Sequence, residues 1–203
     1  MFDEPLRALK SRALYPLVRV VARLTGALPL TLLSLGAGLA SALVIGLDGP
    51  LTTAFALWIL NRLLDGLDGE VARVRGEQND FGGYADMITD VATYAAVPVA
   101  LAFRIGSETV AISIVVLLAA FYLNITSWSY LAALLEKRRL KPAQEVTSIT
   151  MPRGLIEGGE TVVLYSVMIL FPATIGPAAL IASAACVVSV AWRIGWAYHV
   201  LKE

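Results

Sequence analysis

The sequence predicts an all-α membrane protein, with six transmembrane helices preceded by a cytoplasmic amphipathic helix. Hydrophobic residues make up 58% of the 203 residues and charged residues 16%, and the mean hydropathy is +0.73. A soluble domain carries nearer to a quarter of charged residues. Six apolar stretches approach the length of about 20 residues that a spanning helix needs. We therefore expect one domain over residues 1–203, with 1–26 on the membrane surface and 27–203 in the bundle.

The predicted surface helix is the segment "PLRALKSRALYPLVRVVARL", residues 5–24. It mixes leucine and valine with arginine and lysine, which is typical of a helix lying in the membrane interface. Pro16 is expected to break or bend it. A simple charged leader is the alternative. A secretory signal peptide is not expected, because such a peptide is built around a short apolar core.

The six predicted spans cover roughly residues 28–47, 51–73, 82–104, 109–134, 152–172 and 175–198. The first, fourth and sixth are clearly apolar. The second is purely apolar only over "LTTAFALWIL" and reaches full length by including charged residues, while the third and fifth begin with polar halves. An ionised side chain facing lipid is costly. We therefore expect these polar halves to line a shared wet cavity.

The basic residues predict the orientation. If six spans follow a cytoplasmic N-terminus, every lysine and arginine except Arg104 falls on the cytoplasmic side. An excess of positive charge marks the cytoplasmic loops of membrane proteins. Both chain termini, and the acidic stretch "LDGLDGEVARVRGEQNDFGGYADMITD" at residues 64–90, should therefore face the cytoplasm.

The acidic stretch places carboxylates on one face of the second predicted span. At helical spacing Asp65, Asp68 and Ala72 fall within about 60° of one another, and Gly69 lies beside them. Two carboxylates next to a residue without a side chain and one with a single methyl form a recess.

The third predicted span presents a matching face. Gly82, Asp86 and Asp90 follow one another at intervals of four residues, again on one side of a helix. The connector "RVRGEQNDF" is short, so the two helices should be antiparallel neighbours. Their acidic faces can then meet.

Four converging carboxylates without cations would repel one another and take up protons. Oxygen ligands without histidine or cysteine favour Mg²⁺ or Mn²⁺ over zinc, and two such ions could clamp a phosphoryl group in transfer. Arg73 adds a donor fork suited to phosphate. The alternative is that the acids are structural and pair with Arg62, Arg73 and Arg75.

The pattern Asp65-x2-Asp68-Gly69-x2-Ala72-Arg73-x8-Gly82-x3-Asp86-x3-Asp90 resembles the signature of the CDP-alcohol phosphatidyltransferases, and all eight positions are filled. The resemblance implies a homodimeric enzyme of phospholipid biosynthesis. Such an enzyme transfers the phosphatidyl group of a CDP-linked lipid, usually CDP-diacylglycerol, to an alcohol and releases CMP. The short chain is similar to bacterial members, so we expect the bacterial inner membrane as its location, and no nucleic-acid partner.

The resemblance also implies a role for each position of the signature. Asp65, Asp68 and Asp86 would be ligands of two Mg²⁺ or Mn²⁺ ions. Asp90 would complete the metal site and act as the base on the incoming hydroxyl. The CDP moiety would contact three residues, Gly69, Ala72 and Arg73. Gly82 would let the two helices or the nucleotide approach closely.

Basic residues near the same membrane depth suggest a second anion site, for a phosphate on the acceptor. Its candidates are Arg153, Arg193, Lys137 and Arg138, and they favour an acceptor such as inositol phosphate or glycerol phosphate. Alternatively, Arg193 snorkels to the interface and Arg153 pairs with Glu157 and Glu160.

Three other functions stay open at this point. The acceptor could be an unphosphorylated alcohol such as serine. The donor could be CDP-choline or CDP-ethanolamine, with diacylglycerol as the acceptor. From another class of protein, a cation transporter would use the acids as an ion path.

Overall fold

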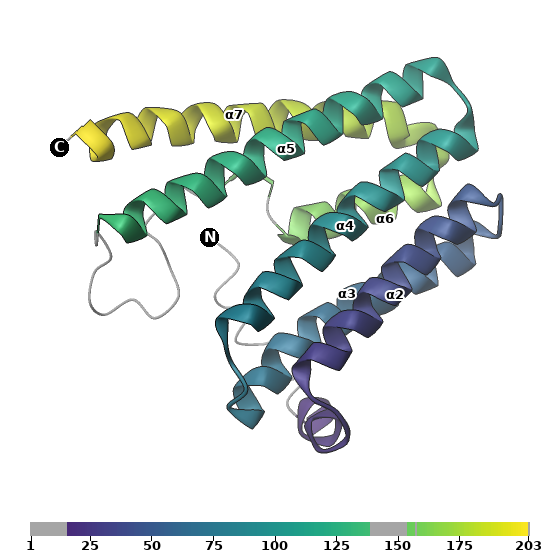
Figure 1. Ribbon diagram of the computed structural model, residues 1–203. Coiled ribbons are helices and arrows are strands. Elements are labelled where there is room, and N and C mark those ends of the chain that lie inside the picture. The colour runs from purple at the N-terminus through teal and green to yellow at the C-terminus, as the bar shows by residue number, and fades with distance from the viewer. Residues whose placement is uncertain (1–15, 139–153, 157, 203) are drawn as a thin grey trace. The chain divides into compact units, whose positions relative to one another are not determined.

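The computed structural model describes residues 16–138, 154–156 and 158–202. Every regular element in this part is a helix. Residues 16–24 form a first helix, which is followed by α2 (Ala27–Gly46), α3 (Leu51–Arg75), α4 (Asp80–Ile105), α5 (Glu108–Lys137), α6 (Gly158–Leu170), the short 3₁₀ helix η1 (Pro172–Thr174) and α7 (Ile175–Lys202) (Figure 1). The all-α prediction is thus confirmed for these residues. They fall into two compact units, residues 1–104 and 105–203, each described by itself below. The single domain stays a prediction.

In the first unit, α2 and α3 form an antiparallel hairpin and lie side by side along their length (Figure 1). Small polar residues hold them together. Ser41 donates to the carbonyl oxygen of Ala54 at 2.8 Å, and the Asn61 amide donates to the carbonyl and hydroxyl oxygens of Ser34, both at 2.8 Å. Asn61 is fully buried. These bonds fix the register of α3 against α2 and therefore the direction in which the acidic face of α3 points.

The helix α4 joins this hairpin at two levels. At its C-terminal end Arg104 donates to the carbonyl oxygen of Gly49 in the α2–α3 loop at 2.7 Å. In its middle Thr93 packs on Gly38 of α2, where an added Cβ would lie 2.5 Å from Thr93 Cγ2. A larger residue at position 38 would therefore force the helices apart. The close approach brings the middle of α4 next to Asn61.

Residues 16–24 pack on the polar end of the hairpin. Val18 and Ala22 are buried in one cluster with Leu30, Leu67 and Val71, and Arg75 donates to the carbonyl oxygen of Ala22 at 2.6 Å. The opposite side leaves large apolar residues exposed, namely Leu17, Val20 and Leu24. This part of the predicted amphipathic helix is helical, with apolar side chains on both the packed and the open face. Residues 1–15 lie outside the described part, and the cytoplasmic position stays a prediction.

In the second unit, α5 and α7 run side by side (Figure 1), and α6 with η1 packs on α7. Tyr165 of α6 is buried and stacks on Phe121 of α5, with ring centroids 6.4 Å apart. Residues 154–156 are not helical. There the backbone N–H of Leu155 donates to Ser189 Oγ at 2.8 Å. Within the described residues, the fifth predicted span, 152–172, therefore becomes helical only at Gly158, because the N–H of Leu155 bonds to α7 instead of to a carbonyl oxygen of its own segment.

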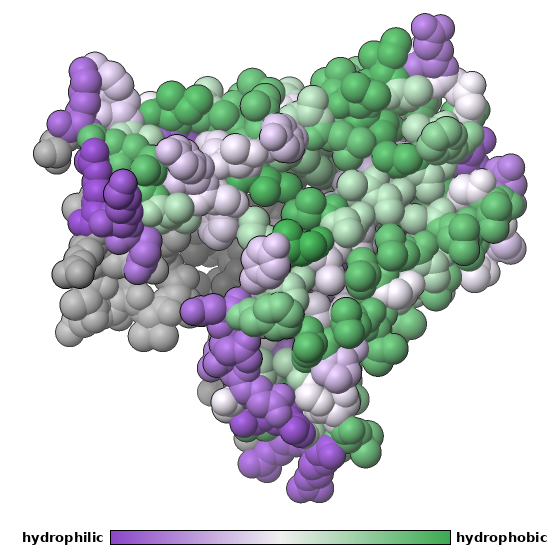
Figure 2. Space-filling view, in the orientation of Figure 1, coloured by the Kyte–Doolittle hydropathy of each residue, from purple (hydrophilic) through white to green (hydrophobic). Residues whose placement is uncertain are grey.

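Four segments are long and apolar enough to cross a membrane, by length and composition: α2, α4, α5 and Pro172–Lys202. The chain is thus an integral membrane protein. Its helix sides are largely hydrophobic, and hydrophilic residues gather at helix ends (Figure 2). The helix α3 is long enough but not apolar enough, because it contains charged residues, and α6 has only 13 residues. Each of the six predicted spans contains a helix. Only these four segments are candidate spans in the described part, so six crossings stay a proposal.

Candidate active site

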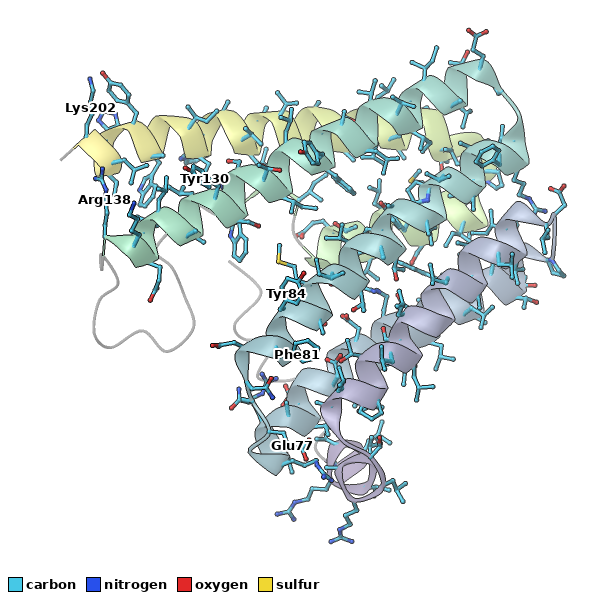
Figure 3. All side chains as sticks on the ribbon, in the orientation of Figure 1. Glu77, Phe81, Tyr84, Tyr130, Arg138 and Lys202 are labelled. Carbon is cyan, nitrogen blue, oxygen red and sulfur yellow. The ribbon has the colours of Figure 1, made fainter. Side chains whose placement is uncertain are left out.

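A cavity of about 390 Å³ lies in the first unit between the start of α2, the C-terminal half of α3 and the first turns of α4. Its lining includes six positions of the signature: Asp68, Gly69, Ala72, Arg73, Gly82 and Asp86. Glu77 and Phe81, which also line it, lie beside the α3–α4 connection (Figure 3). The recess expected from helical spacing is therefore present, and it faces the first turns of α4.

The glycines leave this cavity open. A Cβ at Gly69 would have only the guanidinium of Arg73 within 4 Å, at 3.9 Å. At Gly82 it would meet only the side chain of Asn79, its own helix cap, at 3.6 Å. Close packing of α3 on α4 is thus not what requires a glycine at position 82. The approach of a nucleotide to Gly82 stays a prediction.

The start of α4 lies at this cavity and is capped by Asn79. Asn79 Oδ1 accepts a hydrogen bond of 2.8 Å from the backbone N–H of Gly82, a side-chain cap of the kind that starts helices. The positive end of the helix dipole therefore lies at the cavity, although the N–H groups of Gly82 and Gly83 are already bonded to Asn79. Arg73 lines the same cavity with a side chain that is 54% exposed and pairs with Glu70 at 2.7 Å.

Asp68 is the most deeply held of the acids, with a relative exposure of 5%. Thr31 Oγ1 of α2 donates to Asp68 Oδ2 at 2.7 Å, and the backbone N–H of Gly69 donates to Asp68 Oδ1 at 2.6 Å. Hydrogen bonds to an ionised acceptor are among the stronger ones in proteins. Both carboxylate oxygens are therefore oriented before any ligand binds.

Asp65 and Asp90 lie one helical turn farther from the cavity and share a cation. Arg62 Nη2 donates to Asp90 Oδ1 at 2.8 Å, and Arg62 Nη1 lies 3.6 Å from Asp65 Oδ2. The side chains of these two acids are 25% and 29% exposed. The structural alternative considered above thus describes this half of the site, whereas Arg73 and Arg75 pair with Glu70 and Glu77.

The two halves are close enough to form one acidic cluster. Asp65 interacts electrostatically with Asp90 and Asp86, and Asp86 also interacts with Asp68. Their donor atoms are all carboxylate oxygens, which suits Mg²⁺ or Mn²⁺. Within the described residues, however, no three acidic, histidine or cysteine side chains are grouped closely enough to hold a metal ion as they stand. The donor set therefore fits a hard divalent ion, and binding would require the carboxylates to close in.

Of the residues predicted for an acceptor phosphate, the three that the structure describes belong to the second unit. Arg193 is buried in the second unit at 3% exposure and donates to Asn124 and Ser127 of α5 at 3.1–3.2 Å. Lys137 and Arg138 are exposed at the end of α5. Arg153 and Glu157 lie outside the described residues. An acceptor phosphate at these residues stays a prediction.

Sequence reasoning missed several partners of the acids. It considered Arg62 only as a structural counter-ion, although its spacing of three residues from Asp65 predicts a shared helix face. Thr31 carried no signal, because its contact with Asp68 depends on the register of α2 against α3. The same holds for Tyr94 of α4, whose hydroxyl accepts a hydrogen bond from Arg62 at 2.8 Å.

Comparison with known families shows which protein family the chain belongs to. The family model described as CDP-alcohol phosphatidyltransferase matches residues 24–196, which include every position of the signature. The chain belongs to the CDP-alcohol phosphatidyltransferase family. The resemblance inferred from the signature is thereby confirmed.

Individual relatives are consistent with this membership. The chain is 35% identical to the inner membrane protein YnjF of Escherichia coli K12 over 206 residues, which cover 100% of this chain and 98% of the relative. It is 37% identical to a CDP-diacylglycerol–serine O-phosphatidyltransferase of Methanocaldococcus jannaschii over 62 residues, 30% of this chain and 31% of that protein.

Solved structures show the same fold. The phosphatidylinositol phosphate synthase PgsA1 of Mycobacterium tuberculosis with CDP-DAG bound superposes with a TM-score of 0.70 at 22% identity, covering 91% of this chain and 92% of that one. Its complex with manganese and citrate also gives 0.70 at 22% identity, covering 89% and 86%. At this identity the likeness establishes the fold.

Proposed function

We propose that the chain transfers the phosphatidyl group of CDP-diacylglycerol to the hydroxyl of an alcohol and releases CMP. One observation carries the proposal: six of the eight signature positions line a single cavity at the start of α4. In the reaction the acceptor oxygen forms a new ester bond to the lipid-bearing phosphorus, the pyrophosphate bond to CMP breaks, and the hydroxyl proton leaves.

The cavity accounts for recognition of the donor. Gly69 and Ala72 leave room for the nucleotide, Gly82 lets it approach α4, and Arg73 provides a planar donor fork for its phosphates. The first N–H groups of α4 add partial positive charge at the same place. The lipid tails of the donor would stay in the bilayer beside the apolar helix surfaces, while the nucleotide occupies the polar end of the first unit.

The acidic cluster would hold the metal. Asp65, Asp68, Asp86 and Asp90 are its proposed ligands, and Mg²⁺ or Mn²⁺, in two ions, its proposed occupant. The related synthase with manganese and citrate supports a divalent ion in this fold. When bound, such ions neutralise charge on the pyrophosphate and on the departing CMP.

Asp90 is the proposed base. A carboxylate that accepts the hydroxyl proton in the transition state speeds the attack, provided that it is held within reach of the acceptor. Its bond of 2.8 Å to Arg62 fixes one of its oxygens. In this proposal the carboxylate of Asp90 faces the acceptor once the site is occupied.

The acceptor is proposed at the level of a class. Arg153, Arg193, Lys137 and Arg138 favour a phosphorylated alcohol, such as inositol phosphate or glycerol phosphate. The relative that acts on serine favours an unphosphorylated one, although the match covers 30% of this chain. Both reactions use the same donor, so the donor site does not separate them.

The setting of the enzyme is part of the proposal. Six membrane crossings follow from the apolar stretches of the sequence. A homodimer and a position in the bacterial inner membrane follow from the family resemblance, and the relative described as an inner membrane protein supports the latter. The asymmetry of the basic residues supports a cytoplasmic position for both termini and the active site.

The test is release of CMP by the purified protein in detergent. Labelled CDP-diacylglycerol is supplied with Mn²⁺ and, separately, serine, inositol phosphate or glycerol phosphate, and the lipid product is identified. CMP and a new phospholipid with one of these acceptors would support the proposal. Activity with CDP-choline and diacylglycerol instead would reassign the donor. Metal uptake into proteoliposomes without CMP release would favour a cation transporter.

A further inference from the structure

An arginine outside the eight signature positions lies within the acidic cluster. Arg62 precedes Asp65 by three residues, and its side chain is 8% exposed. It is bonded to Asp90 at 2.8 Å and lies 3.6 Å from Asp65. These are two of the proposed metal ligands, one on each helix. Arg62 therefore links α3 to α4 through the residues that the reaction would use.

The guanidinium of Arg62 is fixed from several sides. Its Nε donates to Asn61 Oδ1 at 2.7 Å, and its Nη1 donates to the hydroxyl of Tyr94 at 2.8 Å. The rings of Trp58 and Tyr94 lie 5.0 and 4.9 Å from its central carbon, within the range of cation–π attraction. Asn61 is itself anchored to Ser34 of α2. With these supports, the group is not one that swings freely towards solvent.

A guanidinium held in this way carries a permanent charge. Without it, four converging aspartates in a partly buried site would repel one another or take up protons, and the repulsion would push α3 and α4 apart. Arg62 neutralises one of these charges and bridges the two helices. The same positive charge opposes a divalent ion that approaches Asp65 or Asp90. It therefore acts on the metal-free and the metal-bound states in opposite directions.

We propose that Arg62 is a resident cation of the acidic cluster, which positions Asp65 and Asp90 before metal binds and weakens metal binding in that half of the site. The inference rests on the proposed function, since it takes these aspartates as metal ligands. Arg62 is a positioning residue in this account, because it acts through the two carboxylates rather than on the substrate.

The experiment compares thermal unfolding of the full chain in detergent, in EDTA and in saturating Mn²⁺. Arg62→Gln should lower the midpoint in EDTA by roughly 5–10 °C, the shift expected for leaving buried charges uncompensated in a protein of this size. Mn²⁺ should close at least half of that gap, because a bound cation replaces the missing charge. Electron paramagnetic resonance of Mn²⁺ should show about tenfold tighter binding, as expected for removal of one positive charge near a divalent ion.

Two control variants separate charge from packing. Arg104→Gln removes another arginine that ties α4 to the rest of its unit, through the carbonyl oxygen of Gly49, away from the acids. Tyr94→Phe removes the hydroxyl that accepts from Arg62 and leaves the charge. Both should lower the midpoint equally with EDTA and with Mn²⁺. If Arg62→Gln behaves like them, Arg62 is only structural and the inference is wrong.

A second variant keeps the test decisive if Arg62→Gln does not fold. The double variant Arg62→Gln/Asp65→Asn removes a positive and a negative charge together. It should fold and unfold in EDTA within a few degrees of the wild type. If the double variant also fails to fold, the proposal is overturned. Where Arg62→Gln does fold, an equally low midpoint of the double variant would overturn it too.

The outcome is separable from that of the proposed function. All these readings are of stability and Mn²⁺ binding, so none needs CMP release. A wild type that binds Mn²⁺ but releases no CMP would refute the transferase and leave the Arg62 inference standing. If the wild type releases CMP and Arg62→Gln loses stability equally in EDTA and in Mn²⁺, the transferase is supported and the Arg62 inference is refuted.

Discussion

The hydroxyl of Thr31 offers a test of the donor side of the site. It lies on α2, outside the signature, and donates to Asp68 Oδ2 at 2.7 Å. The carbonyl oxygen of Ala27 is a weaker competitor for the same proton, at 3.2 Å. Thr31→Val keeps the shape of the side chain and removes this donor. Asp68 would then keep the backbone N–H of Gly69 and lose the bond that fixes its second oxygen.

The size of the effect follows from burial and charge. A hydrogen bond to a charged group contributes about 1.5–3 kcal/mol, and each 1.4 kcal/mol corresponds to about a factor of ten. Since Asp68 is only 5% exposed, water cannot easily replace the lost donor. We expect Thr31→Val to lower kcat/KM for CDP-diacylglycerol by about ten- to a hundredfold, because a carboxylate free to rotate holds both metal and donor less well.

The assay is initial-rate CMP release in detergent at fixed Mn²⁺ and saturating acceptor. Thr31→Ser is the matched control: it retains the hydroxyl and should stay within about threefold of the wild type, since only a methyl contact is lost. Equal rates for Thr31→Val and the wild type would refute the reasoning. So would an equal loss in Thr31→Ser, which would assign the effect to packing of α2 on α3.

Four further predictions concern the proposed residues. EDTA should abolish CMP release and Mg²⁺ or Mn²⁺ restore it, and Asp86→Asn should lose more than about a hundredfold in kcat; full activity in chelator would exclude the metal. Asp90→Asn should bind CDP-diacylglycerol within a few-fold of the wild type yet turn over poorly, whereas an equal loss of both would make it a plain ligand. Gly69→Leu and Ala72→Leu should abolish CDP binding at an unchanged unfolding midpoint, with Gly69→Ala as the tolerated control. Arg193→Ala should raise the acceptor KM strongly and leave the donor KM nearly unchanged, and a lowered midpoint alone would make it structural.

The sequence located the helices and the recess because both depend on local spacing. Apolar runs and turn residues predicted six spans that each contain a helix, and the interval between Asp68 and Ala72 sufficed to put them on one wall of the cavity. Hydropathy alone predicted a helix over residues 154–156, where the N–H of Leu155 bonds to Ser189 of α7 instead. Apolar composition also does not show whether a polar helix such as α3 crosses the membrane.

The division of the acids into two halves was beyond reach of the sequence. Helical spacing puts Asp65 with Asp68 and Asp86 with Asp90, but their separation depends on how far α4 is shifted along α3. That shift is set by contacts between helices distant in sequence, such as Gly38 with Thr93 and Arg104 with Gly49. A single sequence shows which residues are present, but it does not show which of them contact one another.

The helix α2 completes the physical account of the site, although it contributes nothing to the signature. A polar face on α3 cannot be left against lipid, and α2 covers it with small and hydroxyl-bearing residues that allow close packing. Ser34 satisfies Asn61, which in turn holds Arg62, while Thr31 satisfies Asp68. Each half of the acidic cluster is therefore supported by α2, one through a single hydroxyl and the other through a chain of two residues. We therefore expect substitutions on the side of α2 that faces α3 to reduce activity, and substitutions on its other side to be tolerated. Such a difference would show that α2 supports the carboxylates and does not act only as a stable span.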